Sequence, residues 1–159
     1  MGYLIAIEGI NALIDRPAVA RIGDAQERTV HLFGHNEQQR MLAFVKAYPD
    51  DYWLLGFSAG ASASVIRPLI TELDVNGYAL PTHIITVGLF GWNTNENSPR
   101  YENTGISIQN YLDDSGQWHD GQPQCVNLVK TLGRSVPHLD PKLGGMAWLA
   151  DSIEKGAVS

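Results

Sequence analysis

The sequence contains a single cysteine, Cys125, so it cannot form an intramolecular disulfide. It has no block of lysine and arginine, and its formal net charge is −6. These features exclude the basic surface that binds nucleic acid or anionic membranes. The first apolar run ends at Glu8, far short of the roughly 20 residues that span a bilayer, and no basic segment precedes it. We therefore expect a soluble, cytoplasmic protein without a nucleic-acid partner or a membrane span.

The sequence also lacks internal repeats and long polar tracts, and its glycines and prolines are scattered among apolar runs. Its five histidines do not have the spacing of a metal site. His31 and His35 lie four residues apart, but in a segment that reads as strand and turn, with no cysteine or carboxylate cluster to complete a site. A chain of 159 residues with 44% hydrophobic content fits one domain.

Apolar runs alternate with helical patterns along the chain. Runs typical of strands buried on both faces occupy residues 3–7, 29–33 and 52–55, and further strands are predicted over residues 83–90, 106–112 and 126–132. Helices are predicted around Pro17 within residues 16–23, after a cap at Asn36 with Gln39 three residues on, from Ala61 to Leu73, and from Asp140 and Pro141 to Gly156. This order predicts a compact α/β fold, with a mostly parallel doubly wound sheet of about six strands and few flanking helices.

The pentapeptide Gly56-Phe57-Ser58-Ala59-Gly60 has the pattern Gly-x-Ser-x-Gly and lies between a predicted strand and a predicted helix. In this position the serine must occupy a sharp turn, and the flanking glycines let neighbouring backbone pass close by. The start of the following helix favours the negative charge that develops during acyl transfer. Ser58 is therefore the candidate nucleophile.

With this turn the chain resembles the α/β-hydrolase family, most closely its minimal lipases and esterases, over nearly its whole length. The resemblance implies a single α/β-hydrolase-like domain over residues 1–159. It also implies a serine esterase that cleaves carboxylic esters through an acyl-enzyme intermediate, with no metal and no organic cofactor. The family's chain order is nucleophile, acid, histidine.

That chain order identifies Asp113 as the triad acid and His138, just before the last predicted helix, as the general base. Asp114 is an alternative acid, because a shift of one residue in strand register exchanges the side chain that faces the histidine. His119 is an alternative base. It lies in a polar loop soon after the aspartates, although the family pattern does not place the base there.

The family forms its oxyanion hole from two backbone N–H groups, which map to Ala59 and to Ile10, with Asn11 as the alternative to Ile10. Many family members have a histidine where this chain has Glu8. This departure keeps a second interpretation open, in which the protein is a catalytically inactive binding or assembly module. A thioesterase, a peptidase or an acyltransferase would use the same triad, so the sequence does not separate these chemistries.

Two loops, at residues 91–104 and 115–124, bring aromatic side chains toward the expected carboxyl edge of the sheet. Trp92 and Trp118 are the candidate substrate-binding residues, with Tyr101 beside them. No long amphipathic lid is evident, which favours an open-site esterase for a small-molecule or lipid ester. Because larger hydrolases carry helices where these loops stand, we expect one face near the last two strands to lack cover, and hence a homodimer or a larger assembly.

Overall fold

The computed structural model describes residues 2–88, 105–122 and 124–158. Within these ranges six strands form one sheet, all of them parallel, in the order β2-β1-β3-β4-β5-β6. The strands are β1 (Tyr3–Glu8), β2 (Thr29–Gly34), β3 (Tyr52–Phe57), β4 (His83–Val87), β5 (Ser107–Leu112) and β6 (Cys125–Asn127). The α/β fold predicted from the alternating pattern is confirmed.

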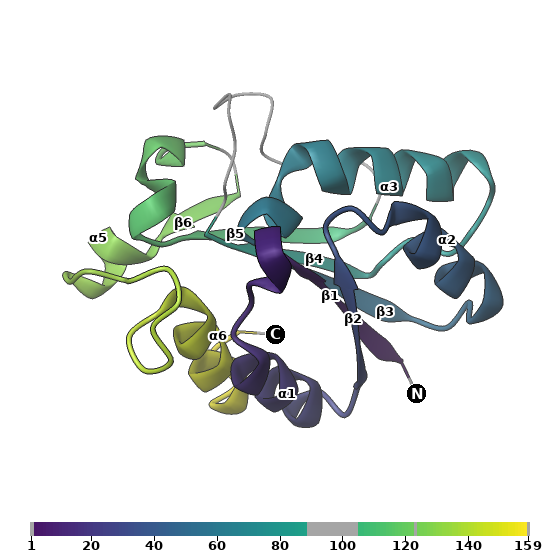
Figure 1. Ribbon diagram of the computed structural model, residues 1–159. Helices are drawn as coiled ribbons and strands as arrows, with labels where there is room; N and C mark the ends of the chain where they lie inside the picture. Colours follow the sequence, from purple (N-terminus) through teal and green to yellow (C-terminus); the bar gives the residue numbers. More distant parts are fainter. Residues whose placement is uncertain (1, 89–104, 123, 159) are drawn as a thin grey trace.

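Helices cover both faces of the sheet (Figure 1). One face carries α1 (Arg16–Ala25) and α6 (Gly145–Glu154), and the other carries α2 (Gln38–Ala47) and α3 (Ala63–Val75). The short helix α5 (Leu128–Leu132) follows β6, and the 3-10 helices η1 (Ile10–Ala12), η2 (Ser58–Ala61) and η3 (Asp114–His119) follow β1, β3 and β5. Among the described residues no helix has the length and apolar character needed to cross a bilayer.

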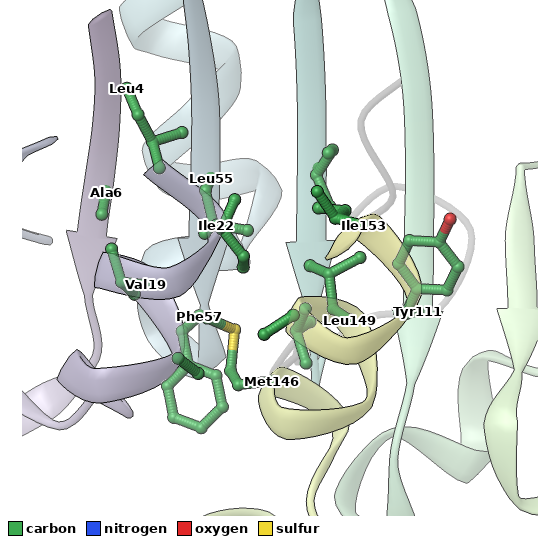
Figure 2. Close-up of a cluster of buried hydrophobic side chains, with 14 of the residues drawn as sticks. Leu4, Ala6, Val19, Ile22, Leu55, Phe57, Tyr111, Met146, Leu149 and Ile153 are labelled. Atoms are coloured by element: carbon green, nitrogen blue, oxygen red, sulfur yellow. The ribbon is translucent and has the colours of Figure 1, made fainter. Parts of the chain in front are cut away.

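Two hydrophobic cores hold the helices to the sheet. Every residue of β1 and β3 is buried, as expected for strands covered on both faces. Because side chains alternate along a strand, Leu55 and Phe57 face α1 and α6, whereas Leu54 faces α2 and α3. Figure 2 shows the first core, in which the Phe57 ring lies beside Met146 of α6. The residue before Ser58 is thereby anchored in the interior.

The predicted strand over 126–132 is wrong beyond its first residues. Only Cys125–Asn127 pairs with β5, and the chain then turns into α5. The Asn127 side chain accepts a hydrogen bond from the N–H of Lys130 at 3.3 Å, which caps the helix, and Gly133 ends it with a φ of 65°. A short apolar run does not distinguish a strand from a helix, and this local capping decides for the helix.

The last helix begins later than predicted, at Gly145 instead of Asp140. The Asp140 carboxylate accepts the N–H groups of Lys142 and Leu143 at 2.8 and 2.7 Å and closes a separate turn. Leu143 is exposed on this turn and is not part of the buried stripe of the helix. Asp140 therefore caps a separate turn before the helix and not the helix itself.

Two smaller differences concern the first helices. Helix α1 extends to Ala25, two residues beyond its predicted end. Helix α2 begins at Gln38, after Glu37 and not after Asn36, and the Glu37 carboxylate reaches back to the N–H of Gly34 at 2.7 Å. Glu37 thus takes the position before the helix that the sequence predicted for Asn36.

Candidate active site

Because the described strands are all parallel, their carboxyl ends lie at one edge of the sheet, where ligands bind in open α/β folds. Strands β1, β3, β4 and β5 end at Glu8, Phe57, Val87 and Leu112. The residues that follow them include the predicted oxyanion, nucleophile and acid positions: Ile10, Ser58 and Asp113. The topology therefore brings these three segments to the same edge.

The strand register sets the spacing across this edge. Phe57 pairs with Val87, and Val87 pairs with Tyr111, so β4 separates Ser58 from the end of β5. Two strand spacings correspond to about 10 Å. An imidazole ring held over the end of β4 can span such a gap, with one nitrogen toward each side.

Ser58 has the backbone conformation of a tight elbow. Its φ of 55° lies in the left-handed region, which is unfavourable for a residue with a side chain. A Cβ on Gly56 would lie 2.5 Å from the carbonyl oxygen of Gly60, and a Cβ on Gly60 would overlap the carbonyl oxygen of Ile7. Both glycines are required by close backbone contacts, as the pentapeptide predicts. The helix α3 does not start here, however, because the 3-10 turn of η2 comes first.

Asp113 and His138 form a direct contact. The distance between Nδ1 of His138 and Oδ2 of Asp113 is 2.7 Å, with the aspartate fully buried and 30% of the histidine side chain exposed. A carboxylate only accepts hydrogen bonds, so Nδ1 carries the proton and Nε2 keeps its lone pair. This is the arrangement of a general base oriented by an acid.

The ring of His138 also stacks on Phe57. The two ring centroids lie 4.5 Å apart with an angle of 24° between the planes. Since Phe57 is fully buried and directly precedes Ser58, the stacking holds the imidazole beside the nucleophile turn.

Gly88, which the sequence analysis did not single out, leaves room for the Asp113–His138 pair. It follows β4 with a φ of 62°, and a Cβ there would lie 2.5 Å from Oδ2 of Asp113 and 2.8 Å from Cε1 of His138. The only signal in the sequence is a glycine directly after the end of a strand. Glycine at this position is needed both for the backbone angle and for the space.

The alternative acid, Asp114, is occupied elsewhere. Its carboxylate accepts the hydroxyl of Ser135 and, at 2.9 Å, the N–H of Val136. These two hydrogen bonds, the hydroxyl first, hold the pKa of Asp114 below its usual value. Between the two aspartates, the structure therefore joins Asp113 to His138.

The alternative base, His119, does not line the mouth of the site as expected. Its side chain is fully buried at the end of η3, with the ring 4.1 Å from the ring of Trp118. Trp118 itself remains 44% exposed. Trp92 and Tyr101 lie outside the described residues. Between the two histidines, the partly exposed His138 has the access that a general base requires.

The turn after β1 runs against Ser58, the predicted nucleophile. A Cβ on Gly9 would lie 3.1 Å from Cβ of Ser58, and the N–H of Gly9 already donates to the carbonyl of Leu13 at 2.9 Å. Ile10 and Asn11 therefore remain the candidates for the oxyanion donor on this turn, and Asn11 has a left-handed φ of 59°. Ala59, the other candidate, is buried in η2.

Glu8, where many family members have a histidine, is buried at the end of β1. Its carboxylate lies 2.9 Å from Nη2 of Arg16, the first residue of α1. The guanidinium offsets the negative charge that Glu8 would otherwise place near a developing oxyanion. This pairing removes part of the reason for regarding the site as inactive.

In the described ranges, no three histidine, cysteine, aspartate or glutamate residues gather in a way that could hold a metal ion. Beside β4 and β5, a hollow of about 290 Å³ is lined by residues of the two strands together with Ala157 and Val158. The C-terminal residues thus cover part of the sheet beside these strands.

Comparisons with known proteins give one weak structural likeness. No family model matches the sequence, and no curated protein matches it. Among solved structures, RedJ with a PEG molecule bound in its active site is similar, with 15% identity and a TM-score of 0.42. The match covers 96% of this chain and 63% of RedJ, so the chain spans less than two thirds of that protein. A likeness of this size carries no argument about activity, which has to be argued from the side chains described above.

Proposed function

We propose that this protein is a serine hydrolase of the α/β-hydrolase family that cleaves carboxylic esters, in the manner of the minimal lipases and esterases. The observation that carries the proposal is the 2.7 Å contact between Asp113 and His138. This contact lies beside the left-handed turn at Ser58, with Phe57 stacked on the imidazole. Nucleophilic acyl transfer needs a hydroxyl, a base beside it and an acid that orients the base.

In the first half of the reaction, Oγ of Ser58 attacks the ester carbonyl carbon while Nε2 of His138 takes the hydroxyl proton. The N–H groups of Ala59 and Ile10 stabilise the tetrahedral oxyanion. The intermediate then collapses, the C–O bond to the alcohol breaks, and His138 returns the proton to the departing oxygen. The acyl group is left on Ser58.

In the second half, a water molecule replaces the alcohol. His138 takes a proton from this water as its oxygen attacks the acyl carbon. The second tetrahedral intermediate then collapses, the bond between the acyl carbon and Oγ of Ser58 breaks, and His138 returns the proton to Oγ, which releases the carboxylic acid and restores the Ser58 hydroxyl. Asp113 stabilises the imidazolium that forms in both halves, because its buried carboxylate stays 2.7 Å from Nδ1. Each step uses only side chains and N–H groups of this chain, so the proposed reaction needs no cofactor.

The side chains around the site support an apolar group in the substrate. Ile10 is 50% exposed next to the proposed oxyanion turn, and Leu139 is exposed next to His138. Large apolar side chains left in water at a site favour binding of an apolar acyl or alkyl group. We propose a small-molecule or lipid ester as the substrate, with Trp118 and Trp92 among the residues that contact it.

The test is chemical labelling of Ser58. The wild-type protein should react with a fluorophosphonate probe and hydrolyse a short p-nitrophenyl ester. Ser58→Ala should lose the label and at least about 10⁴-fold in kcat, because the nucleophile is absent. Ser107→Ala is the matched control, since it removes an exposed hydroxyl from the amino-terminal end of β5, at the edge of the sheet opposite the proposed site, and should keep both the label and the activity.

The same experiment separates the alternatives. A folded wild-type protein that neither takes the label nor hydrolyses the ester would contradict the esterase and favour an inactive binding or assembly module. A protein that labels at Ser58 but prefers thioester or amide substrates in a panel would be a thioesterase, an acyltransferase or a peptidase. Cytoplasmic location and homodimerisation stay predictions from the sequence.

A further inference from the structure

A second hydroxyl, that of Ser115, lies at the Asp113–His138 pair. Its Oγ is 2.5 Å from Oδ1 of Asp113 and 3.1 Å from Nδ1 of His138. The backbone N–H of Ser115 also donates to Oδ1 of Asp113, at 2.9 Å. Asp113 is thus held through both oxygens, with Ser115 on Oδ1 and His138 on Oδ2.

We propose that Ser115 is a positioning residue that fixes the orientation of the His138 ring through Asp113 and through its own oxygen. This inference rests on the proposed function, because the ring it orients is the proposed general base. Ser115 contacts neither the substrate nor Ser58 in this role, so it acts only through the pair.

The number of protons decides how the hydrogen bonds run. The Ser115 hydroxyl has one hydrogen, and the carboxylate of Asp113 can only accept, so this hydrogen goes to Oδ1. The lone pairs of Oγ then face the proton on Nδ1 of His138. That proton is shared by two acceptors, Oδ2 of Asp113 at 2.7 Å and Oγ of Ser115 at 3.1 Å.

Two acceptors around one N–H select a single orientation of the ring. A ring rotated by half a turn would present a C–H group to both oxygens and lose both hydrogen bonds. The correct orientation keeps the lone pair of Nε2 available for the proton of the nucleophile. The hydroxyl of Ser115 therefore favours the ring orientation that the reaction requires.

Because Asp113 is buried, its carboxylate needs the hydrogen bond from the Ser115 hydroxyl in addition to the one from the Ser115 N–H. Asp113 is fully buried, and a buried carboxylate is stable only when its oxygens accept enough hydrogen bonds. Without the Ser115 hydroxyl, Oδ1 keeps one backbone donor, the carboxylate can turn about its own axis, and the ring loses an acceptor. We expect a loss in the chemical step and little change in substrate binding.

The test compares Ser115→Ala with Ser115→Thr, since threonine keeps the hydroxyl at an exposed position. In Ser115→Ala, kcat for a p-nitrophenyl ester should fall by about tenfold, the effect of one lost hydrogen bond, with KM within about twofold of the wild type. In Ser115→Thr, kcat should return to within about threefold of the wild type. The rate of fluorophosphonate labelling should follow kcat.

A spectroscopic measurement gives the same answer without turnover. The Nδ1 proton of His138 should give a far-downfield proton resonance in the wild type, which Asp113→Asn removes. Ser115→Ala should shift this resonance and speed its exchange with water, and Ser115→Thr should restore it.

Three outcomes decide the matter. An unchanged kcat and an unchanged resonance in Ser115→Ala would overturn the proposal, as would a Ser115→Thr variant that is as impaired as Ser115→Ala. If the wild-type protein is inactive, the proposed function fails. In that case the resonance alone decides whether Ser115 orients the ring.

Discussion

At the scale of single residues, the position of Gly88 imposes two requirements that glycine alone among the amino acids meets. Its φ of 62° disfavours any side chain, and the space beside its Cα is filled by Asp113 and His138. Gly77 has nearly the same backbone angle, 68°, but an added Cβ there would meet nothing within 4 Å. The two glycines therefore separate backbone strain from crowding.

Gly77→Ala and Gly88→Ala should carry similar backbone strain but differ strongly in activity. Gly77→Ala should lose about 1–2 kcal/mol of stability from the left-handed backbone, measured by urea unfolding. Gly88→Ala should lose more than this, because its new Cβ is also crowded by Asp113 and His138. Only Gly88→Ala should also lose kcat, by about 10²-fold or more, because the new methyl displaces the Asp113–His138 pair. Equal ester hydrolysis by the two variants would show that Gly88 has no part in the site.

The sequence predicts the residues that carry the proposed chemistry better than the residues that support them. Ser58, Asp113 and His138 follow from a motif and from chain order. Gly88 and Ser115 do not, because their importance depends on the register between β4 and β5 and on the direction of one hydroxyl. Ser115 lies only two residues from Asp113, but its contact with His138, like the contacts of Gly88 with Asp113 and His138, joins distant parts of the chain and leaves no local pattern.

At the scale of elements, the loop that carries His138 is tied to the end of β5. The N–H of Asp114 donates to the carbonyl of Val136 at 2.9 Å, and the N–H of Val136 donates back to the Asp114 carboxylate at the same distance. The hydroxyl of Ser135 adds a third hydrogen bond. Asp114, which the sequence offered as an alternative acid, thus anchors the loop two residues before the base.

This anchor should depend on pH. The pKa of Asp114 is lower in the folded protein than its ordinary value of 3.8, so its contribution is fully present above that value and is lost as the pH falls through the folded pKa. Asp114→Asn should lower Tm at neutral pH, and its difference from the wild type should shrink below pH 3.8. Thermal unfolding across this range checks the trend.

Asp74→Asn, at the far end of α3, is the matched control and should not reproduce this trend. A difference between wild type and Asp114→Asn that stays constant into acid would contradict the anchoring role of the carboxylate.

Among the elements, five strands were predicted close to their observed positions, whereas the sixth was not. The edge strand β2 lies where the sequence predicts it, but it is partly exposed instead of buried on both faces. β1, β3 and β4 are apolar runs buried on both faces, so composition alone identifies them. At the sheet edge, Asn127 turns a similar run into helix, and Asp140 caps a turn in front of α6. Short side-chain to backbone hydrogen bonds decide these places, and several local structures compete for them.

At the scale of the whole molecule, helices from opposite ends of the chain meet on one sheet face. Residues of α1 and α6 join the same core, which includes Leu149 at full burial (Figure 2). On the outside, Arg21 of α1 forms ion pairs with Asp151 and Glu154 of α6. The contact between the two helices therefore has an apolar part and an ionic part.

The apolar part should supply most of the stability. Leu149→Ala should lower the free energy of unfolding by about 2–5 kcal/mol, because it leaves a cavity in a closed core. Arg21→Ala should cost no more than about 1 kcal/mol, since its ion pairs are exposed to water and salt. Urea unfolding of both variants gives the comparison, and a larger loss for Arg21→Ala would reverse this ranking.

The pairing of α1 with α6 also bears on the order in which the proposed site is assembled during biosynthesis. A nascent chain that has left the ribosome as far as residue 144 already contains Ser58, Asp113 and His138. It still lacks α6, so the hydrophobic core between α1 and the sheet is open to water. Phe57, on which the His138 ring stacks, shares that core with Met146. The support behind the His138 ring would therefore become rigid only when α6 docks on the sheet, so any activity of the proposed site should depend on that late step.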